Sequence, residues 1–201
     1  MFDSDVIKKG IKDQAVLKAM RDADRRKFVP NKYSDVAYDD CALPIGEQQT
    51  ISQPFIVAFM TESLHIEKGN KVLELGTGSG FQTAVLTKLG AKVSTIEINK
   101  KLFKESSKRL NDLGYNDISF HYGDGNKGIP EQSPYDRILV TAAPSEIPRD
   151  LLGQLAKNVI MVIPIGNQSE VQYLYRIKKL DDDKIEKEKI LPVHFVPLIK
   201  S

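Results

Sequence analysis

The residues with the clearest chemical potential follow a short apolar stretch in the first half of the chain. Residues 72–75 (VLEL) run directly into Gly76, Gly78 and Gly80, which open a segment of helical periodicity. Glycines let a backbone turn sharply and approach a ligand closely, because no Cβ stands in the way. The pattern is typical of a ligand-binding turn between a strand and a helix, although a plain tight turn has the same local geometry.

Two acidic residues make the turn more specific. Glu74 stands two residues before Gly76, and Glu97 ends the next apolar stretch. The glycine spacing is one residue tighter than the G-x-G-x-x-G fingerprint of dinucleotide sites. A carboxylate at Glu74 would repel a pyrophosphate but can face the amino group of a methionine-like moiety, and Glu97 can bind a ribose diol. These differences favour a sulfonium cofactor.

A third element, Asp124-Gly125, ends the apolar stretch that follows. Its carboxylate could accept a hydrogen bond from the exocyclic amine of an adenine, although an Asp-Gly pair alone is more often a turn. Glycine-rich, acidic and Asp-Gly elements at three successive strand ends are what an S-adenosylmethionine pocket needs. In this respect the chain resembles the core of a class I methyltransferase.

The surrounding elements predict an α/β fold. Short β-branched stretches at 71–75, 92–97, 118–122, 135–141 and 159–163 alternate with helical segments at 80–89, 99–113 and 148–156. Such alternation is typical of a parallel sheet covered on both faces. Strand-like stretches at 171–178 and 187–196 flank a charged tip at 180–184 and predict an antiparallel hairpin. We expect a doubly wound, mostly parallel seven-stranded sheet, Rossmann-like, with an antiparallel C-terminal hairpin.

Some seventy residues precede the first parallel strand and predict an extension of helices and loops. They include an amphipathic stretch at 6–20, a proline-marked loop at 28–49 and a helix at 53–65, for which Ser52 is a suitable N-cap. We expect one methyltransferase domain over residues 1–201. Its parts are the N-terminal helices and covering loop at 1–66, the cofactor-binding core at 67–166 and the antiparallel strands at 167–201.

Composition argues against several classes of protein. The 29 lysines and arginines against 27 acids give a formal charge of +2 with mixed signs, so no basic footprint for nucleic acid is expected. The lone Cys41 and three scattered histidines offer no metal-ligand spacing, and we expect Cys41 to be a reduced, partly buried thiol. No apolar run is long enough to span a membrane, and the acidic start differs from a signal peptide, so a cytoplasmic protein is the expectation. With no internal repeat or evident coiled coil, we expect a monomer.

Residues 38–58 (YDDCALPIGEQQTISQPFIVA) strongly resemble the entry segment of protein-L-isoaspartate O-methyltransferases. The resemblance continues through 28–30, 74–80, 124–125, 129–136, 138–143, 162–166 and 195–198, and so covers nearly the whole chain. It implies methyl transfer from S-adenosylmethionine to the free carboxylate of L-isoaspartyl residues in damaged proteins and peptides. The ester then collapses to a succinimide, and S-adenosylhomocysteine is left.

The resemblance also implies site residues. The family's active-site serine falls on Ser52, in a loop that covers cofactor and substrate. The expected cofactor-binding residues are Gln49, Thr50, Ile51, Ser52, Glu74, Gly76, Thr77, Gly78, Ser79, Gly80, Glu97, Asp124 and Gly125. The expected substrate-binding residues are Ile51, Ser52, Thr141, Ala142, Ala143, Val196, Pro197 and Leu198. From the local sequence, residues 141–144 could equally be packing.

Two positions depart from the family pattern. Gln48 replaces a usual glycine before the Gln-Thr-Ile-Ser run, which puts the flexibility of the covering loop in doubt. Asn158-Val159 replaces a usual Gly-Gly turn, and since valine does not tolerate a left-handed conformation, we expect a turn of another shape there.

The chemistry needs no general base, because the acceptor is an α-carboxylate with an expected pKa of about 3.3 to 3.7. Closure of the loop over residues 49–54 would exclude water, and Ser52 would orient the carboxylate. Two alternatives stay open: a methyltransferase for a nucleobase or small molecule, and a binding module that recognises damaged chains without turnover. The Thr141-Ala142-Ala143-Pro144 segment offers no stacking platform for a base.

Overall fold

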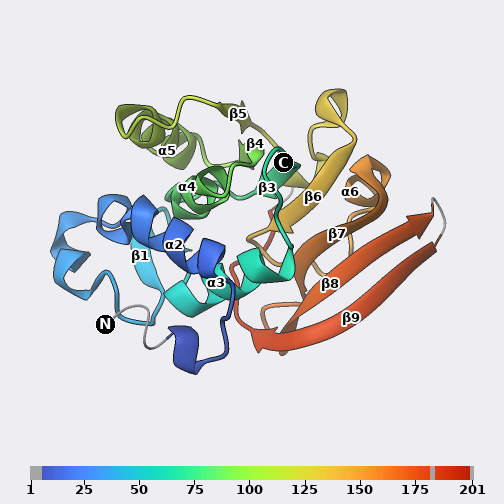
Figure 1. Ribbon diagram of the computed structural model, residues 1–201, viewed down its shortest axis with the longest axis horizontal. Coiled ribbons are helices and arrows are strands. Elements are labelled where there is room, and N and C mark those ends of the chain that lie inside the picture. Colours follow the sequence, from blue (N-terminus) through green and yellow to red (C-terminus); the bar gives the residue numbers. More distant parts are fainter. Residues whose placement is uncertain (1–5, 182–183, 200–201) are drawn as a thin grey trace.

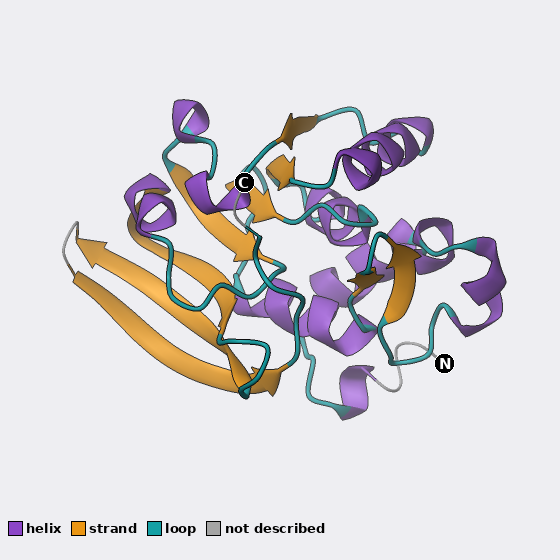
Figure 2. Ribbon diagram, turned by 180° about the vertical axis from the view of Figure 1, so that it is seen from behind, coloured by secondary structure: helices purple, strands orange, loops and turns teal. Residues whose placement is uncertain are grey.

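The structure is a computed structural model that describes residues 6–181 and 184–199. In that part of the chain a seven-stranded sheet has the strand order β5-β4-β3-β6-β7-β8-β9, and β1 and β2 form a separate ribbon. The strands are β1 (Leu43–Gly46), β2 (Gln49–Ile51), β3 (Lys71–Leu75), β4 (Lys92–Glu97), β5 (Ile118–Tyr122), β6 (Tyr135–Val140), β7 (Leu155–Ile165), β8 (Gln172–Asp181) and β9 (Lys184–Val193). Figure 2 shows the β1–β2 ribbon apart from the large sheet, on the side of the N-terminal helices.

Helices precede the sheet and connect its parallel strands (Figure 1). The α-helices are α2 (Gln14–Ala23), α3 (Pro54–Ser63), α4 (Phe81–Lys88), α5 (Lys100–Asp112) and α6 (Arg149–Gln154). Short 3-10 helices are η1 (Arg25–Phe28), η2 (Asn31–Val36), η3 (Gly125–Lys127) and η4 (Pro130–Gln132). None of the described helices combines the length and the apolarity that a membrane span requires.

The predicted fold class is confirmed. Strands β3, β4, β5, β6 and β7 pair in parallel, whereas β7–β8 and β8–β9 are antiparallel. From β3 the chain goes outward in one direction through β4 and β5, and then returns to the other side of β3 as β6. The point between β3 and β6 is therefore a topological switch point, where ligands bind beyond the carboxyl ends of strands.

Alternation along the strands covers the two faces of the sheet with different helices. Val72 of β3 belongs to a core cluster that includes Met60 and Leu64 at the α3 end. The neighbouring Leu73 belongs to the cluster that contains Leu151 of α6. Since successive side chains of a strand point to opposite faces, α3 and α6 lie on opposite sides of the sheet.

The N-terminal extension forms its own apolar cluster against α4. The amphipathic stretch expected at 6–20 is broken at Gly10, whose φ is +106°, and α2 begins only after Asp13. Asp13 is an N-cap, since its carboxylate accepts hydrogen bonds from the backbone amides of Ala15 and Val16. The apolar face of α2 then packs on α4, which fixes the extension beside the glycine turn.

Most predicted parallel strands are confirmed within a residue, and the differences lie in the second half. The helix expected to reach residue 156 ends at Gln154, and β7 begins at once with Leu155. Asn158 has φ +62° at a register shift between β6 and β7, so asparagine supplies the left-handed conformation and Val159 does not. The hairpin of β8 and β9 is confirmed, although residues 182 and 183 of its expected tip lie outside the described residues.

The expectation of a partly buried Cys41 is wrong, because its side chain is exposed. Cys41 lies in the loop before β1, where its backbone amide donates a hydrogen bond of 2.7 Å to the Asp39 carbonyl and its own carbonyl accepts one from Arg25.

Candidate active site

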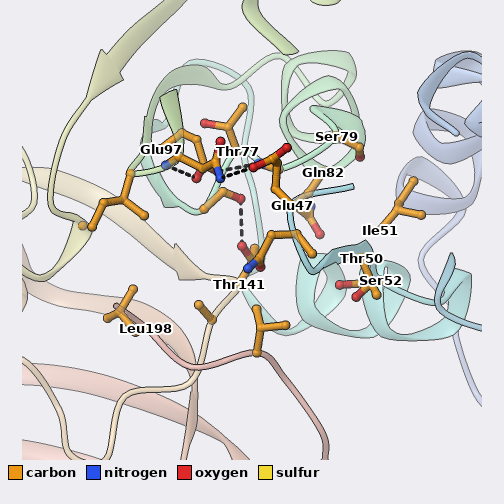
Figure 3. A pocket seen from close by; sticks show the side chains of 18 of the residues that line it. Glu47, Thr50, Ile51, Ser52, Thr77, Ser79, Gln82, Glu97, Thr141 and Leu198 are labelled. Carbon is orange, nitrogen blue, oxygen red and sulfur yellow. Dashed lines mark hydrogen bonds between the residues drawn. The ribbon is translucent and has the colours of Figure 1, made fainter. Parts of the chain in front are cut away.

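A cavity of about 350 Å³ opens at the switch point, beyond the ends of β3, β4 and β6. It is lined by Glu47, Gln49, Thr50, Ile51, Ser52, Val57, Met60, Gly76, Thr77, Gly78, Ser79, Phe81, Gln82, Ile96, Glu97, Ile98, Asn99, Gly125, Thr141, Ala142, Val196, Pro197, Leu198 and Ile199. Figure 3 shows Glu97 and Ser52 on opposite sides of this cavity, with Thr141 between them in the view.

The glycine turn lies against the end of β6, and this contact requires glycine at its first position. Gly76 has φ +89°, and a Cβ there would lie 2.4 Å from Thr141 Oγ1. That hydroxyl is 2.8 Å from the carbonyl oxygens of both Leu75 and Gly76. Thr141 therefore holds the turn in place, which leaves Gly76, Thr77, Gly78 and Ser79 lining the cavity.

Glu97 ends β4 beside the same turn. Its Oε2 accepts a hydrogen bond of 2.9 Å from the Gly78 amide, and its Oε1 accepts one of 2.8 Å from the Asn99 amide. The residue is only 6% exposed, yet it lines the cavity. Each carboxylate oxygen keeps a second acceptor position, so the group can also take hydrogen bonds from a ligand's hydroxyls.

Glu74 does not face the cavity, which corrects its expected role. Its side chain is fully buried and accepts a hydrogen bond of 2.5 Å from Thr83 Oγ1 of α4. Glu74 Oε1 has no hydrogen-bond partner among the described residues. Burial raises the pKa of Glu74 to about 7, although the hydrogen bond from Thr83 acts in the opposite direction. The strand alternation explains the placement, because Glu74 points to the face that α4 covers.

Three other predicted residues lie behind the lining. Gly80 packs on α5, and a Cβ there would approach Leu110 Cδ1 to 2.9 Å. The Asp124 carboxylate accepts a hydrogen bond from the Asn126 amide at 2.9 Å and caps η3, so Gly125 alone of that pair lines the cavity. Ala143 makes backbone hydrogen bonds to Val196 and Leu198, which fix the C-terminal segment.

The expected covering loop is largely a β-hairpin of β1 and β2. Glu47 and Gln48 form its tip with φ +52° and +56°, so Gln48 adopts the conformation that a glycine would favour. The Glu47 carboxylate accepts a hydrogen bond of 3.0 Å from Lys101 Nζ, which connects the tip to α5. Proximity to Lys101 lowers the pKa of Glu47 and raises that of Lys101.

Ser52 follows β2 and is not the N-cap of α3, although its sequence position permits that role. The N-cap is Gln53, and α3 begins with Pro54. The Asp40 carboxylate, distant in sequence, accepts a hydrogen bond of 2.8 Å from the Phe55 amide in the first turn. Within the described residues, the Ser52 hydroxyl makes no hydrogen bond. It is therefore available to a ligand.

A second, larger hollow of about 840 Å³ adjoins the cavity. It is lined by Lys9, Ala42, Thr50, Ser52, Gln53, Phe55, Ile56, Thr141, Leu191, Pro192, Val193, His194, Phe195 and Val196. We call this hollow the groove. Cavity and groove share four residues, namely Thr50, Ser52, Thr141 and Val196.

The predicted substrate residues divide between the two hollows. Ser52, Thr141 and Val196 line both. Ile51, Ala142, Pro197 and Leu198 line only the cavity, and Ala143 lines neither, so these five do not form the wall of the groove. Backbone bonds between Ala143 and residues 196–198 turn this segment toward the cavity.

Sequence reasoning missed the residues that helices bring to the site. Met60 of α3 and Lys9 near the N-terminus lie far from the glycine turn in sequence, whereas Phe81 and Gln82 directly follow Gly80 and could have been found from that position. Asn99 could have been found, because it directly follows Glu97 at a strand's carboxyl end. In the described part of the chain, no three histidine, cysteine or acidic side chains lie together as metal ligands would.

A doubly wound sheet with a glycine turn after β3, an acid at the end of β4, a cavity at the switch point and antiparallel strands β8 and β9 is the arrangement of the Rossmann-like methyltransferases. The chain belongs to the protein-L-isoaspartate(D-aspartate) O-methyltransferase (PCMT) family, whose profile matches residues 2–201.

Individual relatives agree with this membership. A protein-L-isoaspartate O-methyltransferase of Gloeobacter violaceus is 46% identical over 201 residues, which cover 100% of this chain and 98% of the relative. A protein-L-isoaspartate O-methyltransferase of Dictyoglomus thermophilum is 52% identical over 189 residues, which cover 94% of this chain and 85% of the relative.

Solved structures agree as well. One protein-L-isoaspartate O-methyltransferase superposes with a TM-score of 0.87 at 29% identity, over 98% of this chain and 65% of the other chain's length. A putative member from Plasmodium falciparum, in complex with S-adenosyl-L-homocysteine, superposes with a TM-score of 0.85 at 26% identity. The superposition covers 100% of this chain and 97% of the other chain.

Proposed function

We propose that this chain is a protein repair enzyme that transfers a methyl group from S-adenosyl-L-methionine to the free carboxylate of L-isoaspartyl residues in damaged proteins and peptides. The observation that carries the proposal is the junction of two hollows with different linings. The cavity beside the glycine turn meets the larger groove at Thr50, Ser52, Thr141 and Val196. The relatives named above are isoaspartate methyltransferases, and one of the solved structures holds S-adenosyl-L-homocysteine.

The residues that line the cavity fit the cofactor. A volume of about 350 Å³ lies in the range of small-molecule sites. The Glu97 carboxylate suits a ribose diol, and the apolar walls from Ile96 and Ile98 suit an adenine. The cofactor can approach the backbone closely where the lining residues have small side chains or none, namely at Gly76, Thr77, Gly78, Ser79 and Gly125. We therefore assign these residues, with Gln49, Thr50, Ile51 and Ser52 above them, to cofactor binding. Glu74, Gly80 and Asp124 support the site from behind.

The groove fits an extended or kinked polypeptide. It is more than twice as large as the cavity, is open to solvent and carries both apolar and polar side chains, among them Phe55, Ile56 and His194. A damaged residue in the groove could reach the cavity only past the four shared residues. We assign Ser52, Thr141 and Val196 to contact with the isoaspartyl residue.

The acceptor needs orientation more than activation. When bound, S-adenosylmethionine supplies a methyl group on a positively charged sulfur. The acceptor carboxylate is ionised at neutral pH, so no group of this chain has to remove a proton from it. The unengaged Ser52 hydroxyl can donate a hydrogen bond to the carboxylate and hold it at the mouth of the cavity. We assign Ser52 as the catalytic residue in this sense.

Exclusion of water is the other contribution of the protein. Charges of opposite sign are neutralised during the transfer, and water solvates the separated charges best. The β1–β2 hairpin carries Thr50 and Ile51 over the cavity, and Ile51 is 3% exposed. By covering the cavity, the hairpin keeps water from solvating the separated charges, and this favours the transfer.

The decisive assay uses labelled S-adenosylmethionine with an isoaspartyl peptide and its normal aspartyl twin. We expect base-labile methyl ester on the isoaspartyl peptide only. Label on neither peptide would favour a binding module without turnover, and label on both would contradict the selectivity. In a parallel reaction that offers a nucleobase or a small molecule as the acceptor, label there and on neither peptide would move the chain to another substrate class.

A further inference from the structure

Arg25 is a fully buried arginine in η1 that belongs neither to the cavity nor to the groove. No carboxylate makes an ion pair with it in the described ranges 6–181 and 184–199. A buried cation without an ionic partner is costly unless its donors are satisfied in another way. The hydrogen bonds that Arg25 makes therefore indicate its structural role.

The guanidinium donates hydrogen bonds to three backbone carbonyls. Nε donates to Ala37 at 2.7 Å, Nη2 to Cys41 at 3.2 Å and Nη1 to Ser52 at 2.5 Å. Burial lowers the pKa of Arg25 to about 10, which still leaves the guanidinium protonated at neutral pH. A planar group with five N–H donors can reach several acceptors at once in fixed directions.

The three acceptors lie on both sides of the covering hairpin. Ala37 and Cys41 precede β1, and Ser52 directly follows β2. Arg25 thus connects the segment that leads into the hairpin with the residue that follows it, at the base of the hairpin. The guanidinium also lies 5.6 Å from the centre of the Phe81 ring, whose residue lines the cavity.

We infer that Arg25 is a positioning residue for methyl transfer, which sets the backbone at Ser52 and so aims the Ser52 hydroxyl at the junction of cavity and groove. This inference rests on the proposed function and on the role of Ser52 in it. Glu97 and the glycine turn are fixed by the sheet instead, so we expect cofactor binding, to which the hairpin contributes only from one side, to depend less on Arg25 than turnover does.

Two substitutions test the role. Arg25→Lys keeps the charge but cannot span three carbonyls, and Arg25→Met keeps the approximate volume without donors. We expect kcat on an isoaspartyl peptide to fall roughly 10- to 100-fold, further for Met than for Lys. The Kd for S-adenosyl-L-homocysteine should change less than about threefold. The binding stoichiometry from the same calorimetric titration gives the concentration of folded enzyme, and kcat is calculated per folded enzyme.

Arg137 provides the matched control. It also donates to backbone carbonyls, at 2.6 Å to Leu64 and 3.0 Å to His65, but it lines neither hollow. Arg137→Lys should keep kcat within about twofold per folded enzyme.

Three outcomes overturn the inference: an Arg25→Lys enzyme with unchanged kcat, an equal loss in Arg137→Lys, or a loss of cofactor affinity as large as the loss of kcat. If Arg25→Met does not fold, the Lys variant decides alone. A wild-type enzyme inactive on the isoaspartyl peptide would refute the proposed function instead, so the two failures are distinguishable.

Discussion

The amide of Gly78 lies 2.9 Å from Glu97 Oε2, so the glycine turn after β3 is bonded directly to the acid that ends β4. The Asn99 amide engages the other oxygen at 2.8 Å. Two backbone donors thus hold one carboxylate at the cavity wall, and a substitution that keeps its shape but removes its charge tests its function.

We therefore predict that Glu97→Gln weakens binding of S-adenosyl-L-homocysteine roughly 10- to 100-fold in calorimetry. The amide side chain can accept at one oxygen only, so the donor of Asn99 or Gly78 loses its partner and the ligand's hydroxyls lose a charged acceptor. Glu105→Gln on the exposed side of α5 should bind as wild type does. Equal affinities of Glu97→Gln and wild type would remove Glu97 from the site.

Gly76→Ala should destabilise the fold more than Gly69→Ala. The two glycines have nearly the same φ, +89° and +90°, but only at Gly76 would a Cβ meet an atom, Thr141 Oγ1 at 2.4 Å. We expect Gly69→Ala to lower the free energy of unfolding by about 1 kcal/mol, and Gly76→Ala to lower it by roughly 1–3 kcal/mol more. Urea titrations measure both, and equal losses would show that the contact with Thr141 carries no cost.

Ser52→Ala should lower turnover on an isoaspartyl peptide roughly tenfold, since one hydrogen bond to the carboxylate is lost. Affinity for S-adenosyl-L-homocysteine should be retained, because the glycine turn and Glu97 are intact. Ser63→Ala, at the end of α3 and outside both hollows, is the control. Unchanged turnover in Ser52→Ala would withdraw the catalytic assignment.

Glu74 should make the protein less stable as pH rises. Burial raises its pKa in the folded state to about 7 from an ordinary value of 4.5, so the folded state binds the proton more tightly than the unfolded state. The stability that this group contributes is complete below pH 4.5 and is lost as pH rises toward 7. It stays lost at higher pH.

Glu74→Gln removes this dependence. Between pH 4.5 and pH 8, we expect the free energy of unfolding of the variant to gain roughly 2–3 kcal/mol relative to wild type, read from denaturant titrations at several pH values. Parallel curves for the two proteins would show that Glu74 keeps an ordinary pKa.

Gln172→Leu should disturb the segment that lines the groove. The buried Gln172 accepts a hydrogen bond of 2.6 Å from the Phe195 amide and donates one of 3.1 Å to the Phe195 carbonyl. Leucine leaves the Phe195 amide without a partner, while the Phe195 carbonyl keeps its bond from Gln168. We therefore expect a loss of roughly 1–3 kcal/mol in unfolding free energy and a higher KM for the peptide. Gln168→Leu removes the 2.7 Å hydrogen bond to the same carbonyl but leaves the Phe195 amide bonded to Gln172, so it is the milder control. Equal effects on KM would argue against a specific role for Gln172.

The parallel strands of the core could be predicted because their apolar, β-branched stretches are short and separated by turn residues. The stretches expected at 71–75, 92–97 and 118–122 match β3, β4 and β5. The change from helix to strand at Leu155 could not be predicted. The local sequence there permits a further helical turn, and only pairing with β6 selects the strand. Ser52 shows the same limit, since its type favours an N-cap while Asp40 engages the start of α3 from another segment.

The sequence by itself determined the fold class, the glycine turn, the acid at Glu97 and the family, because these depend on residue types and short spacings. Only the tertiary structure decided which of those residues face the cavity. Glu74 and Glu97 both stand near the turn in sequence, but strand alternation sends the first beneath α4, whereas the end of β4 leaves the second at the cavity wall. Arg25 and Lys9 reach the covering hairpin and the groove through packing across long stretches of chain, which no local pattern encodes.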